Sequence, residues 1–347
     1  MKLFCPGPVN VLKKIKNIDI NEISHRTNNF HLLYNNCTNI TKSLFNVNND
    51  KFTPLFITGS GTITVESIIY SYLKNKNILI LQNGSFSEKW EKLFETYNSN
   101  YFTLNFEWGN SFDYEKITSF LNKNIIIDGI FFVHHETSTT QINDLNKLND
   151  IAIKYKIKLY IDGVSSVGIY NINLKKLSSI DSIGFSSNKG IGIYPGLAVI
   201  MVKTNLFSTM ENKLSYLNLK TYYEFSLKSE TPFTPCYQNF EHYYISVSDI
   251  VSNLQSRYLH YENLMDYFIK ELNKIGIKPY LEKQQCIWVI NIKCNKPDYL
   301  YDELFKNDII VYKCKGKLKK ECVQIAILNK TKTDIQFLIS KIKCILN

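Results

Sequence analysis

Short runs of β-branched and aromatic residues alternate along the N-terminal part of the chain with segments whose apolar positions recur at helical spacing. Residues 77–84 predict a strand that ends in a turn, and 85–97 have the pattern of an amphipathic helix. A buried strand within 124–137 precedes the helical pattern 143–156 in the same way, and strand-like segments follow at 158–166, 179–187 and 196–203. This alternation predicts an α/β fold with a mostly parallel sheet covered on both faces.

The pattern changes after about residue 245, where the alternation of strands and helices ends. One long helical pattern covers 245–276, and a last helix ends the chain. Between them, strands are expected at 286–293, 309–313 and 323–328. We interpret this region as a smaller α+β domain. The expected organisation is an N-terminal arm, a large cofactor-binding domain and a small C-terminal domain, with bounds 1–20, 21–245 and 246–347.

Composition and charge narrow the functional class. The 347 residues are 44% hydrophobic and 21% charged, as in an ordinary soluble globular protein. No apolar run reaches the roughly 18 residues of a membrane span, and the N-terminus lacks the apolar stretch of a secretory signal, so we expect no membrane partner and a cytoplasmic location. The net charge is +10, but Arg26 and Arg257 are the only arginines and the lysines are dispersed. This composition favours a small anionic substrate over nucleic acid.

The eight cysteines are scattered along the chain. They form no CxxC pair, and no Cys/His cluster has the spacing of zinc ligands. Neither a disulfide framework nor a metal site is expected, and the simplest interpretation is a set of reduced thiols in and near the core.

The first candidate for chemistry is Lys189, which follows a predicted strand in a loop rich in Ser, Asn and Gly. A buried ammonium with little charge compensation loses its proton readily, so this lysine is a candidate Schiff-base nucleophile. Asp162 ends the strand predicted from residue 158. A carboxylate and an amine at the ends of neighbouring strands can flank a planar pyridine cofactor, the acid at the ring nitrogen and the amine at the aldehyde carbon. Taken singly, a solvated lysine is the default interpretation of Lys189, and a helix N-cap or a loop hydrogen bond is the alternative for Asp162.

A third candidate is the segment 57–69, where Ser60 and Gly61 stand at a strand-to-helix junction. Backbone N–H groups at such a junction form an anion site suited to a cofactor phosphate. The segment lacks the lysine of a P-loop and does not have the GxGxxG pattern. A plain tight turn with a helix cap has the same residue pattern.

Taken together and in order, seven motifs resemble the class V, fold-type I aminotransferases that use pyridoxal phosphate. The motifs are FCPGPVNV (4–11), ISHRTNNF (23–30), TGSGTITVES (58–67), NGSFSEKW (83–90), HHETSTT (134–140), IDGVSSVG (161–168) and SSNKGIGIYPG (186–196). The paired histidines and the PGPVNV opening are most similar to the 2-aminoethylphosphonate:pyruvate aminotransferases. The resemblance spans roughly residues 4 to 260 and implies the fold, with a large sheet domain and a smaller domain, and the cofactor pyridoxal 5′-phosphate.

The resemblance implies a role for each matching residue. Lys189 matches the lysine that binds the cofactor covalently and shuttles a proton, and Asp162 the acid that keeps the pyridine nitrogen protonated. Thr234 matches a threonine that reaches the cofactor phosphate of the neighbouring subunit, which implies a homodimer with shared active sites. The remaining cofactor-binding matches are the phosphate turn Ser60, Gly61 and Thr62, the ring-stacking Phe86, the hydroxyl of Thr137, and Ser187.

Arginine is so scarce that Arg26 is the leading candidate for a bidentate anion contact. In relatives its loop lies at the mouth of the active site, so His25 and Arg26 are candidate ligands of a substrate phosphonate or carboxylate. A structural ion pair is an equally good interpretation of Arg26. Arg257 matches a family Arg-Tyr pair, for which a structural role is expected.

Two departures from the family pattern bear on the substrate. Gln324 stands where relatives carry an arginine that grips the substrate carboxylate, and a neutral amide cannot form that charge-assisted pair. Either a lysine of the segment GKLKK supplies the charge (Lys317, Lys319 or Lys320), or the amino donor is not an ordinary α-amino acid. Thr140 replaces the glycine that relatives have after the Thr-Ser-Thr segment.

The sequence therefore predicts an aminotransferase that moves an amino group between 2-aminoethylphosphonate and pyruvate, in either direction, or between a similar pair. The alternative within the same cofactor class is a lyase, or an aminotransferase, acting on another small amino phosphonate or phosphate; the loss of the arginine at position 324 favours it. A cysteine desulfurase is less favoured because no cysteine has an activated loop setting. A noncatalytic binding protein on the same fold is disfavoured by the intact Lys189 and Asp162.

Overall fold

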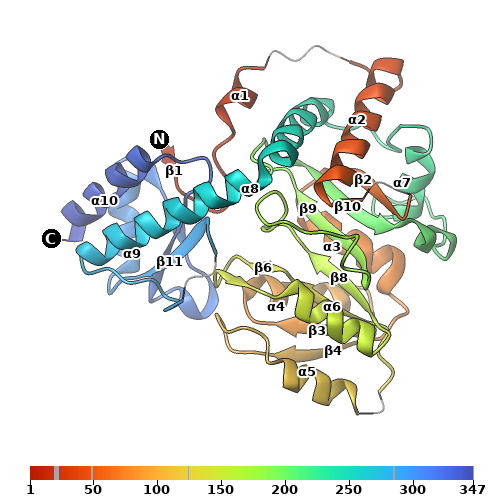
Figure 1. The fold of residues 1–347 in the computed structure, drawn as a ribbon, viewed down its shortest axis with the longest axis horizontal. Coiled ribbons are helices and arrows are strands. Elements are labelled where there is room, and N and C mark those ends of the chain that lie inside the picture. Colours follow the sequence, from red (N-terminus) through yellow and green to blue (C-terminus); the bar gives the residue numbers. More distant parts are fainter. Residues whose placement is uncertain (19–22, 48–49, 124, 284–285, 347) are drawn as a thin grey trace.

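The computed structural model describes residues 1–18, 23–47, 50–123, 125–283 and 286–346. A large domain is built on one central sheet, a small domain contains the C-terminus, and one long helix, α8, runs between them (Figure 1). No helix in the described part of the chain is long and apolar enough to cross a membrane.

The central sheet of the large domain has seven strands in the order β2-β10-β9-β8-β5-β3-β4. Only β10 runs antiparallel to its neighbours, because β9 continues into it through a short loop without a crossover helix. The other pairs are parallel, so the predicted mostly parallel sheet is confirmed. The strands are β2 (Phe52–Gly59), β3 (Ile78–Gln82), β4 (Tyr101–Asn105), β5 (Gly129–Val133), β8 (Lys158–Asp162), β9 (Ile180–Ser186) and β10 (Gly196–Lys203).

Alternating residues of these strands enter two separate cores. In β3, Leu79 and Leu81 belong to the core on one face, and Ile78 and Ile80 belong to the core on the other. Such double-sided burial explains why the strands read as continuous apolar runs. The helices that cover the sheet are α2 (Asn28–Leu44), α3 (Thr62–Ile68), α4 (Ser85–Thr96), α5 (Tyr114–Leu121), α6 (Leu145–Lys154) and α7 (Leu219–Ser226).

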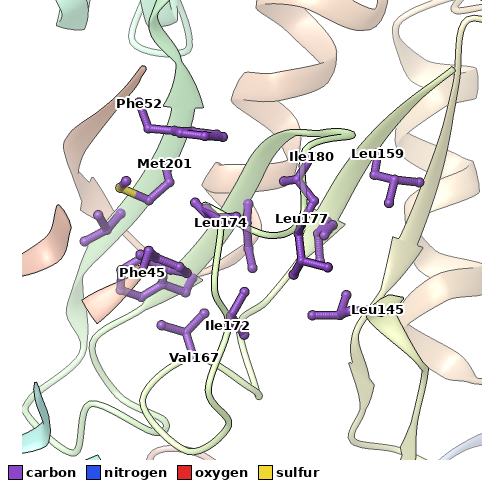
Figure 2. Packing of buried hydrophobic residues seen from close by; sticks show 14 of the residues in the cluster. Phe45, Phe52, Leu145, Leu159, Val167, Ile172, Leu174, Leu177, Ile180 and Met201 are labelled. Atoms are coloured by element: carbon purple, nitrogen blue, oxygen red, sulfur yellow. The ribbon is translucent and has the colours of Figure 1, made fainter. Parts of the chain in front are cut away.

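One part of the predicted alternation is wrong. No helix connects β8 to β9; the chain between them is a series of turns. This connection instead places Val167, Ile172, Leu174 and Leu177 against the apolar face of the sheet (Figure 2). The buried side chains take the place of a crossover helix in covering the sheet, and they hold the segment after Asp162 close to the strand ends.

The small domain combines a three-stranded antiparallel sheet, in the order β11-β14-β13, with two helices and the second half of α8. Its own apolar core contains residues from all of these elements except the short β13. The N-terminal strand β1 belongs here too, because it pairs in parallel with β12. The elements are β1 (Lys2–Leu3), β11 (Val289–Lys293), α9 (Pro297–Lys306), β12 (Ile309–Ile310), β13 (Tyr312–Lys313), β14 (Cys322–Ala326) and α10 (Lys332–Leu346).

The helix α8 (Tyr237–Lys274) crosses the expected boundary at 245/246 without ending there. Phe240 and Val247 lie in the core of the large domain, whereas Leu264 and Phe268 lie in that of the small domain. The backbone is non-helical at Asn253, where the helix is kinked between its two halves. The other expected boundary, at 20/21, lies outside the described residues. Two short hairpin strands, β6 (His135–Glu136) and β7 (Gln141–Ile142), and a short helix, α1 (Lys13–Lys16), complete the fold.

Candidate active site

The ends of β8 and β9 bring Asp162 and the loop of Lys189 to one edge of the sheet. These strands are parallel neighbours, and Asp162 is paired in register with Gly184. The carboxyl edge of a parallel sheet is where ligands bind in such folds. The two residues that carry the predicted chemistry are therefore attached at or just after the ends of adjacent strands.

The Lys189 amine is partly buried and donates a hydrogen bond to the carbonyl oxygen of Pro6 at 2.7 Å. Removal of the ammonium from water lowers its pKa from 10.5 to about 8, and the positive charge of Lys315 acts in the same direction. Asp162 opposes this shift without cancelling it. A substantial fraction of Lys189 is thus a neutral amine near physiological pH, as a nucleophile requires.

Asp162 is 3% exposed, and each of its carboxylate oxygens accepts one hydrogen bond. Trp90 Nε1 donates to Oδ2 at 2.8 Å, and the Val164 backbone N–H donates to Oδ1 at 2.9 Å. Burial raises the pKa of Asp162 to about 6 despite these two donors. The carboxylate is oriented and still has lone pairs for a further donor.

A pocket lies beside the Lys189 amine and has walls from both domains. Phe86 comes from the first turn of helix α4 and Thr137 and Ser138 from the turn after β6, all in the large domain, and Gln324 comes from strand β14 of the small domain. The Thr137 hydroxyl donates to Ser165 Oγ at 2.5 Å. Further lining residues come from the N-terminal segment and from the turn after β13: Pro6, Gly7, Tyr312, Cys314 and Lys315.

Gly7 lies directly against the Lys189 side chain. A β-carbon added there would lie 2.3 Å from Lys189 Nζ. The absence of a side chain lets the backbone of residues 6 and 7 approach the amine directly. The PGP motif is a family match in the sequence, but its contact with Lys189 was not predicted.

Glu136 orients the N-terminus of α4, on which Phe86 stands. Its buried carboxylate accepts from the backbone N–H groups of Phe86 at 3.3 Å and Ser87 at 2.9 Å, and from the hydroxyl of Ser138 at 2.6 Å. A carboxylate in this position satisfies otherwise unpaired N–H groups and interacts favourably with the helix dipole. The His-His-Glu-Thr motif was visible in the sequence, but this function of Glu136 was not predicted.

The predicted phosphate turn lies at the start of α3. Ser60 is exposed, and Gly61 is the residue before the first helical position, Thr62. A β-carbon on Gly61 would lie 2.7 Å from Val164, in the loop that follows Asp162. Lys89 Nζ donates to Thr62 Oγ1 at 3.2 Å, which brings to the turn a cation that was not predicted from the sequence.

The structure places Ser187 and Thr234 away from the Lys189 pocket of the same chain. The Ser187 hydroxyl donates to the backbone oxygen of Tyr194 at 2.7 Å and thereby closes the Lys189 loop on itself. Thr234 is exposed in the segment between α7 and α8. Neither residue lines the pocket, so their predicted contacts with the cofactor stay predictions.

Arg26 forms an ion pair with Glu230, on the surface of the large domain, and its guanidinium lies over the ring of Phe225. Neither Arg26 nor His25 lines the pocket, so the structure favours the ion-pair interpretation of Arg26 within one chain. Arg257 has a structural contact: its guanidinium donates to the backbone oxygen of Gly190 at 2.8 Å, next to Lys189.

Gln324 does line the pocket, but its amide nitrogen is already bonded. It donates to the backbone oxygen of Thr137 at 2.7 Å and to Asn291 Oδ1 at 2.8 Å. An amide nitrogen has two donors, so both are used within the protein. Thr140, at the other departure from the family pattern, has φ +63°, a left-handed conformation that glycine adopts without strain and threonine rarely adopts.

Comparison with known proteins identifies the family. The sequence pattern of the family Aminotransferase class-V matches residues 9–296. The chain is 28% identical over 316 residues to an uncharacterised aminotransferase of Methanocaldococcus jannaschii, covering 88% of this chain and 80% of that protein. It is 22% identical over 330 residues to a 2-aminoethylphosphonate–pyruvate transaminase of Bacillus cereus, covering 92% of this chain and 90% of that protein.

The fold agrees with this assignment. The solved structure of an alanine–glyoxylate aminotransferase from Nostoc sp. superimposes with a TM-score of 0.90 at 18% identity, covering 99% of this chain and 95% of that one. The site also has groups that pyridoxal phosphate needs: the amine of Lys189, with its lowered pKa, and the ring of Phe86 line the pocket. The buried carboxylate of Asp162 interacts electrostatically with Lys189 but does not itself line the pocket. The chain belongs to the class V aminotransferases and is a fold-type I, pyridoxal-phosphate-dependent aminotransferase.

Proposed function

We propose that this aminotransferase moves an amino group between 2-aminoethylphosphonate and pyruvate, or in the reverse direction from an amino acid to phosphonoacetaldehyde. The observation that carries the proposal is the pocket in which the Lys189 amine lies beside Gln324, whose amide donors are already used. The pocket has the groups for transamination but is lined by no arginine, so the phosphonate of one substrate and the carboxylate of pyruvate or of the amino acid both need another cationic partner. The Bacillus cereus relative is named for this activity, and its similarity to this chain covers 90% of that protein.

The cofactor supplies an aldehyde that condenses with amines and a pyridine ring that accepts electrons from the adjacent carbon. Asp162 would hold the proton on the ring nitrogen, because its carboxylate is buried, oriented by Trp90 and Val164, and able to accept a further donor. Phe86 would pack against the ring. The phosphate would bind at the turn of Ser60, Gly61 and Thr62.

Lys189 would act in two ways. Its neutral amine would hold the cofactor through the aldehyde, and once an incoming amine has taken its place, the freed Nζ would remove a proton from the carbon that bears the substrate nitrogen. The same Nζ would then deliver a proton to the former aldehyde carbon of the cofactor. A positioned base with a pKa near the operating pH suits both directions of transfer. The hydrogen bond to Pro6 is a candidate for holding the amine while it is free.

The proposal includes a homodimer with shared active sites. Thr234 is exposed at the surface of the large domain, where it is free to reach a neighbouring subunit. His25 and Arg26 would have to act from the same surface if they contact substrate. Sedimentation of the purified protein measures the oligomeric state, and a monomer at catalytic concentrations would overturn this part of the proposal.

The test is the absorbance spectrum of the purified holoenzyme with 2-aminoethylphosphonate and no keto acid. Loss of the yellow absorbance, with release of about one equivalent of phosphonoacetaldehyde per subunit, supports the proposed half-reaction. L-alanine added to a second sample tests the other substrate. Lys189→Ala is the control: we expect it to lose at least about 10²-fold in turnover, the smallest loss typical of removing a general base.

A lyase acting on a small amino phosphonate is the second candidate, and the used donors of Gln324 are the observation that favours it. A lyase consumes its amine continuously without a keto acid, whereas an aminotransferase stops after one turnover. Release of several equivalents of product in the same experiment would therefore replace the first proposal by the second.

A further inference from the structure

One transverse row of residues across the three-stranded sheet supplies part of the small-domain wall of the pocket. Gln324 pairs with Asn291 on one side and with Tyr312 on the other. Directly opposed residues of antiparallel strands point to the same face of a sheet. The alternate positions, including Ile290 and Val323, belong to the small-domain core. The row Asn291–Gln324–Tyr312 therefore faces the large domain, and Gln324 and Tyr312 line the pocket.

The two amides of this row form hydrogen bonds between the two domains. The Gln324 nitrogen bonds Thr137 O and Asn291 Oδ1, and the Asn291 nitrogen donates to Ser138 O at 2.8 Å. The nitrogen of each amide lies against an oxygen, so exchanging the nitrogen and oxygen of either amide would break these hydrogen bonds. Both amide donors of Gln324 are used, and Asn291 does not line the pocket, so neither amide offers a donor there to an anionic substrate group. A charge-assisted partner would bind such a group more strongly than a neutral one.

The lysines of the neighbouring turn differ in what they contact. Lys313 is paired with Asp298 at 2.9 Å, and Lys317 lies over the Trp108 ring. Lys320 lines neither pocket. Lys315 lines the Lys189 pocket and also a second, outer pocket that shares Tyr312 and Cys314 with it. No ion pair joins Lys315 to a carboxylate in the described part of the chain, and its ammonium lies 5.6 Å from the Tyr312 ring centroid.

We propose that Lys315 binds the anionic group of the amine substrate, phosphonate or carboxylate, in place of the arginine that relatives carry at the position of Gln324. The inference rests on the proposed function, in that it assigns the substrate's charged end to one residue of that site. It names a different lysine from the three expected from the sequence: Lys319 lines only the outer pocket, and Lys317 and Lys320 line neither pocket, whereas Lys315 lines the pocket of Lys189.

The electrostatics of the pocket agree with this position. The positive charge of Lys315 lowers the pKa of Lys189, so the two side chains interact. A phosphonate or carboxylate bound at Lys315 compensates that charge. The exposed position of Lys315 at the mouth lets the substrate enter with its anionic end towards the outer pocket and its amine towards Lys189. An ammonium is a point charge without the planar, two-pronged geometry of a guanidinium, so it can bind either a phosphonate or a carboxylate.

The experiment measures binding of phosphonoacetate and of acetate to the holoenzyme by equilibrium dialysis. Neither probe has an amine, so the measurement does not depend on turnover. We expect Lys315→Met to weaken phosphonoacetate binding at least tenfold, Lys315→Arg to retain it within threefold, and the matched charge-removal control Lys320→Met to leave it unchanged. Weaker binding of acetate by the same factor indicates that one site serves both anions.

Equal binding by wild type and Lys315→Met would overturn the proposal, as would the absence of binding to wild type at millimolar concentration. A Lys320→Met variant that weakens binding as much as Lys315→Met would also overturn it, because general surface charge would then be sufficient. Turnover of 2-aminoethylphosphonate is measured separately. Its absence, with Lys315-dependent anion binding intact, refutes the substrate pair and leaves the anion site standing.

Discussion

The two walls of the pocket differ in how their side chains are held. On the large-domain side, Lys189 lines the pocket from the loop after β9, whereas Asp162 ends β8 outside the pocket lining and is almost completely buried between two donors. On the small-domain wall, Gln324 is fixed by internal hydrogen bonds while Lys315 is exposed. Groups for the chemical step thus stand on one domain, and the groups that face the rest of the substrate stand on the other. The second set can change without disturbing the first.

The largest expected effect is on the large-domain wall, in the pH dependence of cofactor uptake by Lys189. Burial lowers the pKa of Lys189 to about 8. Below that pH the neutral amine becomes scarcer by about tenfold for each pH unit, so uptake of pyridoxal phosphate by the apoenzyme should rise about 50-fold from pH 6 to pH 8 and then level off. Stopped-flow absorbance measures the rate.

An ordinary lysine would behave differently. With the usual lysine pKa of 10.5, the rate would keep rising well above pH 9. Such a profile would contradict the low pKa assigned to Lys189. The same titration with free pyridoxal phosphate and a simple amine corrects for ionisation of the cofactor, and Lys189→Ala shows the background.

A smaller effect is expected on the small-domain wall. Gln324→Leu removes two hydrogen bonds and leaves the Thr137 and Asn291 oxygens without this donor, so we expect the free energy of unfolding to fall by about 2 kcal/mol. Urea unfolding measures it. The exposed Gln255→Leu is the matched control and should stay within about 0.5 kcal/mol of wild type. A Gln324→Leu variant as stable as wild type would show that the amide row does not hold the domains together.

The smallest effect concerns a residue outside both walls. Arg26 does not line the pocket, and Arg26→Lys keeps a cation beside Glu230, so we expect KM for 2-aminoethylphosphonate to change by less than about twofold. Steady-state kinetics test this. A clear rise in KM would instead place Arg26 in the substrate site, most directly through the neighbouring subunit of a dimer.

Much of the large-domain wall could be predicted from sequence. Two local patterns indicated the sheet, Asp162 and the Lys189 loop. One is the apolar run typical of a strand, and the other is the group of small residues at the end of a strand. The position of Gln324 in the pocket was also anticipated, from the family arginine that it replaces.

The contributions of Lys315, Gly7 and Asn291 could not be predicted in this way. Each depends on how the small domain and the N-terminal segment meet the large domain, which is a contact between parts of the chain far apart in sequence. Local periodicity carries no information about such contacts. The connection between β8 and β9, which contains no helix, could not be predicted for a related reason. Isolated apolar residues in a run of turns have no periodic pattern, although they cover the sheet as a helix would.

The helix α8 has a consequence for folding. Its first half supplies Phe240 and Val247 to one core, and its second half supplies Leu264 and Phe268 to the other. Loss of either core removes the packing partner of half the helix, and an isolated half-helix is marginal in water. The stability of each domain is therefore linked to that of its neighbour, and the geometry of the pocket between them is maintained by the same segment that makes the two domains fold as a cooperative unit.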